Sequence, residues 1–333
     1  MWPLQVLQAQ KKRYVEWVKA RPELPFQYHP AWLDVVCGPD HWSAVVEGPE
    51  CRPYGLWPFW YRPRWKGMLV EMKMPPYTPQ LGPLLDLPPQ KRRASGYALE
   101  HKVLASLLEK LPAADVINHN LHYTCQNALP FAWAGFHQRM RYSYWVDVEE
   151  ADPETLRRSF SEGKRQEVRR GLKNGLQWDD GVSLDAFIQL HLHDLYIRGA
   201  APAYTPELLS NMTRAMRAIG DCWICGARSA EGHLLAAHVL MVQPRQTCNL
   251  MMALSPEGRK MGAPAWLIWQ ILVALRGHTR TFDFEGSVQP AIERSYRQYG
   301  GYRKAFLQVE KNQHLLYRLR RAVRIIKGKS FAF

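Results

Sequence analysis

The first half of the chain alternates apolar and polar positions in short runs, a pattern typical of half-buried β-strands. The runs are rich in Val, Trp, Tyr and Phe and are separated by turn signals such as Gly48-Pro49 and by the proline-rich stretch 75–83. We predict a short helix at 28–36, strands at 42–47, 54–61 and 68–74, a helix at 96–111, a strand at 115–118, a helical stretch at 125–134 and a strand at 138–148.

The second half opens with a helix whose start is well marked. Asp152-Pro153-Glu154 supplies an N-cap, a proline at the first helical position and an acidic residue in the first turn, and the helix should end near Gly175. We then predict helices at 183–198 and 205–219, strands at 222–228, 234–242 and 247–254, a helix at 264–275, a strand at 280–285, a helix ending near 299, a strand at 302–310 and a closing helix at 312–327.

The two halves share an order of elements. Each runs from a strand hairpin through an irregular loop to a helix, a strand, a second helix that ends at a glycine (Gly135, Gly300), and a strand with alternating aromatic residues. This order predicts a mixed α/β protein of two similar domains side by side, with a cleft between them. We place the first domain at 1–149 and the second at 150–310, and we expect the closing segment 311–333 to complete the first.

The closing helix is predicted to be amphipathic and cationic. Docking on the core of the first domain is one interpretation, and contact with an anionic membrane is the alternative. The apolar positions are Leu315, Leu316, Leu319, Val323 and Ile326, and the basic ones are Arg318, Arg320, Arg321, Arg324 and Lys327.

Composition indicates a folded chain, with 47% apolar and 22% charged residues among 333. Lys11, Lys12 and Arg13 interrupt any secretory-signal pattern near the start, and the longest apolar run, 262–275, is shorter than the roughly 20 residues of a membrane span. We therefore expect a cytoplasmic protein without a transmembrane helix, located at the cytoplasmic face of a membrane if the closing helix binds lipid.

The six cysteines suggest neither a disulfide framework nor a metal site. Cys222 and Cys225 have C-x-x-C spacing, but no second pair follows at zinc spacing, and residues three apart on a strand face opposite ways. His191 and His193 lie in a predicted helix without further ligands nearby in sequence. We expect no metal and no tightly bound cofactor.

Net charge is +14 and is concentrated in two segments, 156–173 and 303–329. Solvated helix faces would explain both segments. A surface that meets phosphates of tRNA, of a nucleotide-linked substrate or of lipid headgroups would explain them equally. In the first segment, helical spacing suggests one cationic face suited to a diphosphate or a tRNA backbone, made of Lys164, Arg165, Arg169 and Arg170.

Several motifs near the end of the second domain follow one another in a familiar order. Asp283-Phe-Glu-Gly-Ser287, Ile292-Glu-Arg294 and Tyr299-Gly300, with the basic run 164–176 and the loop 75–83, resemble the FemAB-like (FemABX, peptidoglycan bridge-type) acyltransferases. The resemblance covers about 28–309. It implies two tandem GCN5-related N-acetyltransferase (GNAT) folds, each with a mixed, mostly antiparallel sheet flanked by helices. The first domain would serve the acceptor, and the second the donor and the chemistry.

The resemblance also points to a donor-binding turn. Members of the GNAT fold hold the CoA pyrophosphate on an Arg/Gln-x-x-Gly-x-Gly/Ala loop, and the matching stretch here is Arg259-Lys-Met-Gly262-Ala-Pro264. Its proline removes one backbone donor, which disfavours CoA. We assign donor binding to Arg259, Gly262 and Ala263. Peptidoglycan-type members carry a Phe-Lys pair before their final Phe-Gly, where this chain has Tyr296-Arg297.

Amide formation needs a base for the attacking amine, a proton for the leaving group and donors for the oxyanion. On an extended strand, Asp283 and Glu285 would share the face turned to the cleft. We assign Glu285 as general base or ammonium-binding group, Asp283 as the group that orients the acceptor, and Tyr296 or Arg297 as proton donor or charge stabiliser. Helix capping or an arginine pair would equally explain the acids. We expect Tyr77 and Gln80 to line the acceptor cleft.

Three functions remain open from the sequence. The first is a FemAB-like acyltransferase that forms an amide, with aminoacyl-tRNA as donor and an amine acceptor that is nucleotide- or lipid-linked. The second is an acyl-CoA-dependent GNAT N-acyltransferase acting on a lipid, sugar or peptide amine. The third is a non-catalytic adaptor that binds RNA or a membrane surface.

Overall fold

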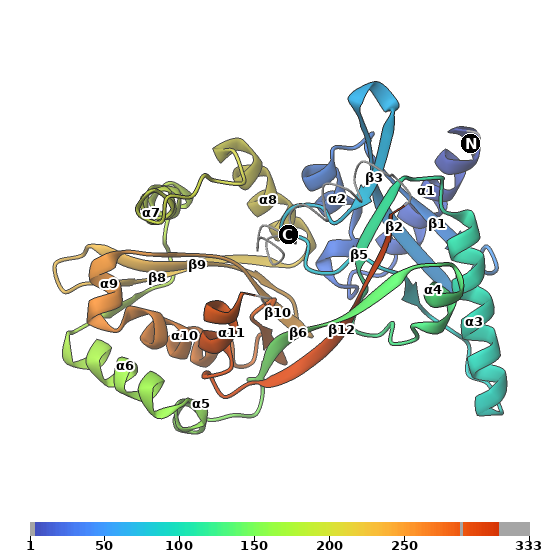
Figure 1. Cartoon of the computed structure of the whole chain (residues 1–333). Coiled ribbons are helices and arrows are strands. Elements are labelled where there is room, and N and C mark those ends of the chain that lie inside the picture. The colour runs from blue at the N-terminus through green and yellow to red at the C-terminus, as the bar shows by residue number, and fades with distance from the viewer. Residues whose placement is uncertain (1–3, 287–288, 313–333) are drawn as a thin grey trace. The chain divides into compact units, whose positions relative to one another are not determined.

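The computed structural model describes residues 4–286 and 289–312. These residues form two compact units (Figure 1): residues up to Tyr142 together with those from Ala305 onward, and Ser143–Lys304. No helix among the described residues is long and apolar enough to cross a membrane. The predicted helix at 312–327 lies outside the described residues, except for Asn312, which ends a strand.

The first unit is built on a mixed sheet with strand order β1-β2-β3-β5-β12, and β4 pairs with β2. β3 and β5 are parallel, and β12 is antiparallel to β5. α1 packs along β1, whereas α3 crosses β1 and β2 and contacts α4. Its elements are α1 (Leu4–Lys19), α2 (Pro30–Cys37), β1 (Trp42–Glu47), β2 (Gly55–Arg64), β3 (Leu69–Lys73), β4 (Leu84–Leu85), α3 (Arg93–Lys110), β5 (Val116–Asn120), α4 (Leu129–Trp133) and two 3-10 turns (Phe26–Tyr28, Trp65–Gly67).

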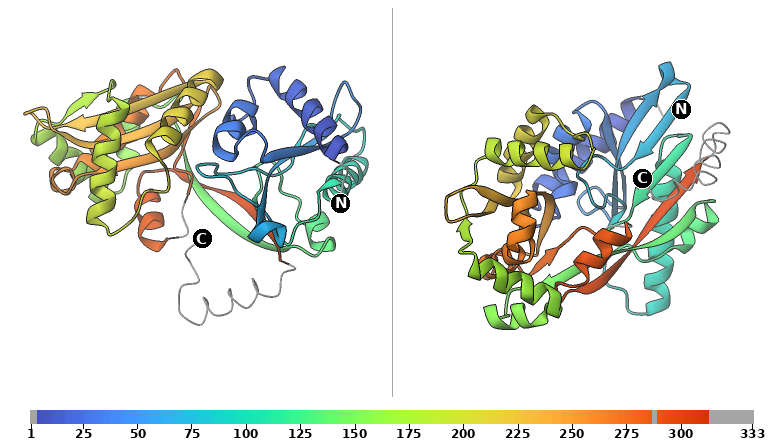
Figure 2. Two further views of the ribbon diagram at one scale, coloured as in Figure 1. Left: turned by 90° about the horizontal axis from the view of Figure 1, so that it is seen from above. Right: turned by 60° about the vertical axis from the view of Figure 1, so that its left-hand side comes forward.

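The second unit has the strand order β6-β11-β10-β9-β8-β7. α10 covers one face with α5 and α6 packed against it, and α7 and α8 lie on the other face (Figures 1 and 2). Its elements are α5 (Pro153–Ser159), α6 (Glu162–Lys173), β7 (Gln177–Asp179), α7 (Leu184–Ile197), α8 (Pro206–Ile219), β8 (Asp221–Arg228), β9 (Leu234–Val242), β10 (Gln246–Leu254), α9 (Pro256–Met261), α10 (Ala263–Ala274), β11 (Thr281–Asp283) and α11 (Pro290–Tyr296).

Two long strands pass from one unit to the other. β6 (His137–Asp147) pairs with β11 in the second unit, and β12 (Tyr302–Asn312) pairs with β5 in the first. The strand that pairs with β5 and the strand that pairs with β11 therefore each come from a distant part of the sequence. These two strands also supply core side chains. Leu307 and Val309 of β12 belong to the first core, and Val146 of β6 belongs to the second.

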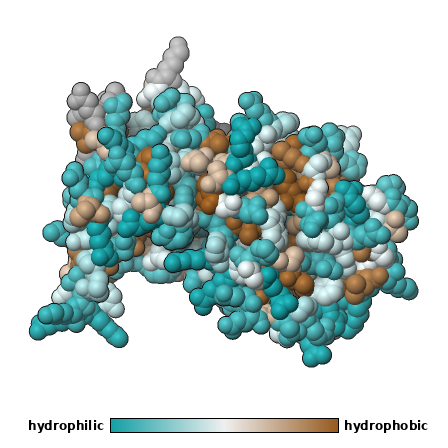
Figure 3. Space-filling model, turned by 180° about the vertical axis from the view of Figure 1, so that it is seen from behind, coloured by the Kyte–Doolittle hydropathy of each residue, from teal (hydrophilic) through white to brown (hydrophobic). Residues whose placement is uncertain are grey.

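Apolar side chains fill a separate core in each unit. Trp57, Phe59 and Phe131 are among the fully buried residues of the first core, and Trp266 and Phe282 are buried in the second. On the face shown in Figure 3, hydrophobic side chains are interspersed with hydrophilic ones. The predicted mixed α/β fold class is confirmed.

Three predicted elements differ from the observed ones. The basic helix is broken into α5 and α6, because Phe160 turns into the core and Ser161 caps α6 by accepting the N–H of Lys164. The helical stretch 125–134 shrinks to α4, and the strand at 280–285 ends at Asp283. Gly135 and Gly300 have φ values of 79° and 75°, as expected of glycines that end helical segments.

Candidate functional site

In the second unit, the pairing of two neighbouring parallel strands stops where the shorter strand ends. β10 and β11 run parallel and pair over three residues, from Gln246 with Thr281 to Cys248 with Asp283. Beyond that point β11 ends, whereas β10 continues to Leu254. A register shift between Asn249 and Met251 marks a β-bulge in β10, which bends the strand. The carboxyl end of β11 therefore lies beside the middle of β10, and the residues that follow β11 leave the sheet here.

Asp283 is the last residue of β11. It is fully buried, and three groups donate hydrogen bonds to its carboxylate: the hydroxyl of Ser143, the amide of Gln246 at 2.8 Å and the backbone N–H of Glu285 at 2.7 Å. We predicted that Asp283 faces a cleft beside Glu285. That orientation is wrong, because the strand ends at Asp283 and its carboxylate turns inward to these donors.

Glu285 lies one residue past Phe284, in the irregular segment after β11, and has a φ of 61°. This left-handed conformation is strained for a glutamate, by about 1–3 kcal/mol, and the bond from its N–H to Asp283 helps to hold it. Its Oε1 is shielded from solvent and has no hydrogen-bond partner among the described residues. Burial, with a smaller contribution from Asp283, raises the pKa of the Glu285 carboxyl well above its usual value.

Tyr296 is the second predicted residue near Glu285. Its ring packs on Phe284 with centroids 4.9 Å apart. Burial raises the pKa of Tyr296 to about 12, and the negative charge of Glu285 adds to the effect. Arg297, the residue that follows α11 as its C-cap, is exposed and forms an ion pair with Glu293 at 3.8 Å. The structure therefore brings together Asp283, Glu285 and Tyr296, but gives Arg297 a different partner.

Three residues around this group were not predicted. Ser143 and Gln246 hold Asp283, and Cys248 lies opposite Asp283 in the strand pairing. Burial raises the pKa of the Cys248 thiol well above its usual value, and the charges of Asp283 and Glu285 reinforce this. These residues come from β6 and β10, so only the strand register reveals them.

The predicted donor-binding turn is closed by packing. Gly262 has a φ of 87°, and a Cβ there would lie 2.3 Å from the carbonyl oxygen of Glu167 on α6. Its N–H donates to the carbonyl of Arg259 at 3.4 Å, and Gly262 and Ala263 are both buried. The glycine thus permits close contact between helices, and neither residue is open to a phosphate. Arg259 is exposed on α9.

The predicted cationic residues of α6 do not share one face. Lys164 is buried on the side of α6 that carries Val168 and Gly171, with its ammonium 3.1 Å from Glu167. Arg165 and Arg169 both pair with Glu162. Arg170 is exposed. A single cationic face is wrong, because the four positions spread around the helix and one of them points into the unit.

The two predicted acceptor residues belong to the first unit. Tyr77 is half-buried and has a φ of 52°. Gln80 is buried and donates to the hydroxyl of Tyr123 at 3.0 Å. The amide of Gln80 is therefore already used in the interior of the unit.

All six cysteines are free thiols, and five of them are buried. In the described part of the chain, no three side chains of His, Cys, Asp or Glu gather as metal ligands would. Burial raises the pKa of Cys222 to about 11 and also raises that of Cys225, so neither thiol is activated.

Residues 156–291 match the family model of the acetyltransferase (GNAT) domain, a range that includes the parallel pair β10 and β11, Asp283 and Glu285. Over this stretch the chain is similar to the acetyltransferase (GNAT) domain. The prediction of an acyltransferase is thereby confirmed at the level of reaction class. No curated protein sequence matches the chain.

Solved structures share the fold of nearly the whole chain, including the tandem arrangement around the GNAT domain. A structure of FemX is 14% identical with a TM-score of 0.67, covering 93% of this chain and 98% of that one. The C-terminal domain of a putative lysylphosphatidylglycerol synthetase from Agrobacterium fabrum is 12% identical (TM-score 0.54; 96% and 97% covered). A conserved protein of unknown function from Bacteroides thetaiotaomicron is also 12% identical (TM-score 0.51; 93% and 98%). The predicted FemAB-like fold is confirmed.

Proposed function

We propose that this protein transfers an aminoacyl group from aminoacyl-tRNA to an amine, with Glu285 as the general base. The observation that carries the proposal is the half-buried Glu285, whose Oε1 is shielded from solvent and has no partner among the described residues, just past the end of β11. A buried acceptor without a partner costs about 1–3 kcal/mol, so the site favours a ligand that donates a hydrogen bond or proton to it. An ammonium group does both.

The reaction begins when the Glu285 carboxylate takes a proton from the acceptor ammonium. The neutral amine attacks the carbonyl carbon of the aminoacyl ester, and the attacking nitrogen then loses its second proton to solvent. The tetrahedral intermediate collapses by breaking the bond to the ribose oxygen. That oxygen leaves with a proton from the Tyr296 hydroxyl or from protonated Glu285. A raised pKa makes Glu285 a stronger base than an ordinary glutamate, which suits proton transfer near neutral pH.

Two features favour tRNA as donor. The chain carries a net charge of +14, and basic residues attract a nucleic acid backbone. The turn at Gly262 and Ala263 is buried, which disfavours the pyrophosphate of CoA at these two residues. This donor implies a cytoplasmic reaction. The acceptor amine on a nucleotide- or lipid-linked molecule is part of the same proposal.

Filter binding and transfer assays test the proposal together. Bulk aminoacylated tRNA should bind with an affinity that falls steeply as salt rises. Glu285→Gln should keep this binding and lose release of the aminoacyl group to a panel of amines. Glu150→Gln, an exposed glutamate of the same unit, is the matched control. Affinity no better than that of an unrelated basic protein would refute the tRNA donor.

An acyl-CoA donor is the second candidate, because the matching family model describes acetyltransferases. It keeps the same role for Glu285 and replaces the ribose ester by a thioester. Acetyl-CoA or a longer acyl-CoA at millimolar concentration should then raise the melting temperature. If no acyl-CoA raises the melting temperature and the protein binds tRNA, the acyl-CoA donor is refuted and aminoacyl-tRNA remains as the donor.

A further inference from the structure

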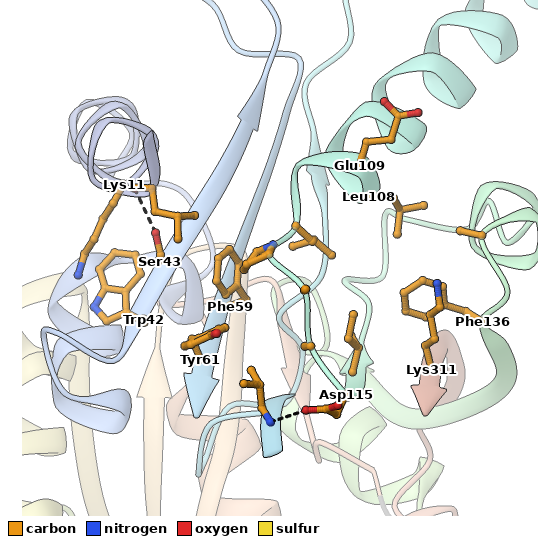
Figure 4. A pocket seen from close by; sticks show the side chains of 18 of the residues that line it. Lys11, Trp42, Ser43, Phe59, Tyr61, Leu108, Glu109, Asp115, Phe136 and Lys311 are labelled. Atoms are coloured by element: carbon orange, nitrogen blue, oxygen red, sulfur yellow. Dashed lines mark hydrogen bonds between the residues drawn. The ribbon is translucent and has the colours of Figure 1, made fainter. Parts of the chain in front are cut away.

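The first unit has a large groove that the proposed reaction does not use. Its volume is about 1350 Å³, and α1, β2, α3, β5 and α4 contribute side chains to its walls (Figure 4). The walls are mostly apolar, including Leu7, Phe59, Leu108 and Phe136. Trp133 also lines the groove, yet it is 68% exposed. Open apolar surface of this kind marks a binding surface.

The described chain ends at this groove. Lys311 is one of the lining residues, and its ammonium lies 5.4 Å from the centroid of the Phe136 ring. In the sheet, Lys311 pairs with Ile117, which also lines the groove, and Asn312 pairs with Val116. The last described residues therefore lie beside the groove wall.

The sequence that follows has the chemistry to cover such a groove. Residues 313–333 contain six basic residues and no acidic ones. Leu315, Leu319, Val323 and Ile326 recur at a spacing of three to four, the period of one helix face. A helix rises about 1.5 Å per residue, so this segment reaches about 30 Å, the width of a small domain.

We propose that residues 313–333 bind in this groove as an amphipathic helix and complete the first unit. The apolar face meets the apolar walls, and the basic face remains at the rim. Charge is complementary there: Glu109 is exposed at the groove and forms no ion pair with another described residue, and Asp40 and Asp115 also line it. Lys11 is already engaged with the ring of Trp42, 4.0 Å from its centroid.

Hydrogen exchange on the full-length protein, followed by mass spectrometry, tests this contact. The double variant Leu319→Gln, Val323→Gln should speed exchange of peptides from 105–115 and 129–136 by roughly tenfold. Peptides of β8 and β9 in the other unit should not change. Arg320→Gln, on the predicted basic face, is the matched control and should leave the groove peptides protected.

A second variant tests the contact from the groove side. Ala105 is exposed in the groove, so Ala105→Trp fills the space without removing a core side chain, and it should speed exchange within 315–326. Groove peptides that exchange equally in all variants would overturn the proposal. Protection that grows with protein concentration would assign the groove to a second copy and also overturn it.

Vesicles containing phosphatidylglycerol distinguish the membrane alternative. Three results together would show that the segment is a lipid anchor: the wild type binds the vesicles, the double variant does not, and the groove peptides exchange equally in both proteins. In that case the proposal is wrong. Neither result depends on tRNA binding or on transfer by Glu285, so this proposal and the proposed function can fail separately.

Discussion

Replacing Glu285 by glutamine should remove activity and at the same time stabilise the protein at neutral pH. Glutamine keeps the shape of the side chain and cannot ionise. In the wild type, the carboxyl is buried near Asp283, and these surroundings raise its pKa well above the usual value. The folded chain therefore retains a proton on Glu285 at pH values where the unfolded chain has lost it.

Linkage gives the size of the effect. An unfolded glutamate loses its proton near a pH of about 4.3. Between that pH and the pKa of folded Glu285, the free energy of unfolding of the wild type falls by about 1.4 kcal/mol per pH unit from this group alone. Above the pKa of folded Glu285, this decrease in the free energy of unfolding is complete and stays constant. The variant has no such loss, so the stability difference grows with pH and then levels off.

Urea denaturation of both proteins across pH 4 to 9 measures this difference directly. Buried histidines such as His238, whose pKa burial lowers to about 4, titrate in both proteins and cancel. Glu150→Gln, at an exposed position of the same unit, is the matched control variant. A stability difference for Glu285→Gln that is the same at every pH would contradict a pKa raised by burial.

Three further substitutions test the surroundings of the site. Tyr296→Phe keeps the ring packing and should lower kcat by roughly 100-fold or more if the hydroxyl protonates the leaving group, with little change in melting temperature; an unchanged kcat would exclude that role. Ser143→Ala removes one donor to buried Asp283 and should lower the free energy of unfolding by about 1–3 kcal/mol in urea denaturation. Gly262→Ala should lower the free energy of unfolding by about 1–3 kcal/mol in the same assay, because its Cβ would lie 2.3 Å from the Glu167 carbonyl oxygen at a φ of 87°. An unchanged free energy of unfolding would show that α6 can move away.

Alternation and turn signals were enough to place most strands, because side-chain periodicity reports burial locally. The amino-terminal helix α1 was not predicted, although Tyr14, Trp17 and Val18 form its buried face. Spacing alone also did not reveal that Lys164 points inward, since a long side chain can be buried when Glu167 pairs with it.

At the site, residue types could be predicted but their geometry could not. The sequence pointed to Asp283, Glu285 and Tyr296 as a group. It did not show that the strand ends at Asp283 or that Glu285 adopts a positive φ, because a glutamate rarely does so. Ser143 and Gln246 are far away in sequence, and their bonds to Asp283 depend on a register that only the folded sheet defines.

The exchange of β6 and β12 has a consequence for how this protein is made. On the ribosome, the amino-terminal 142 residues emerge first, but the strand that pairs with β5 and carries Leu307 and Val309 is synthesised only after the whole second unit. Until then β5 has an unpaired edge, a known source of aggregation. An early fragment should therefore require a chaperone, and no single cut in the gene yields two self-sufficient halves.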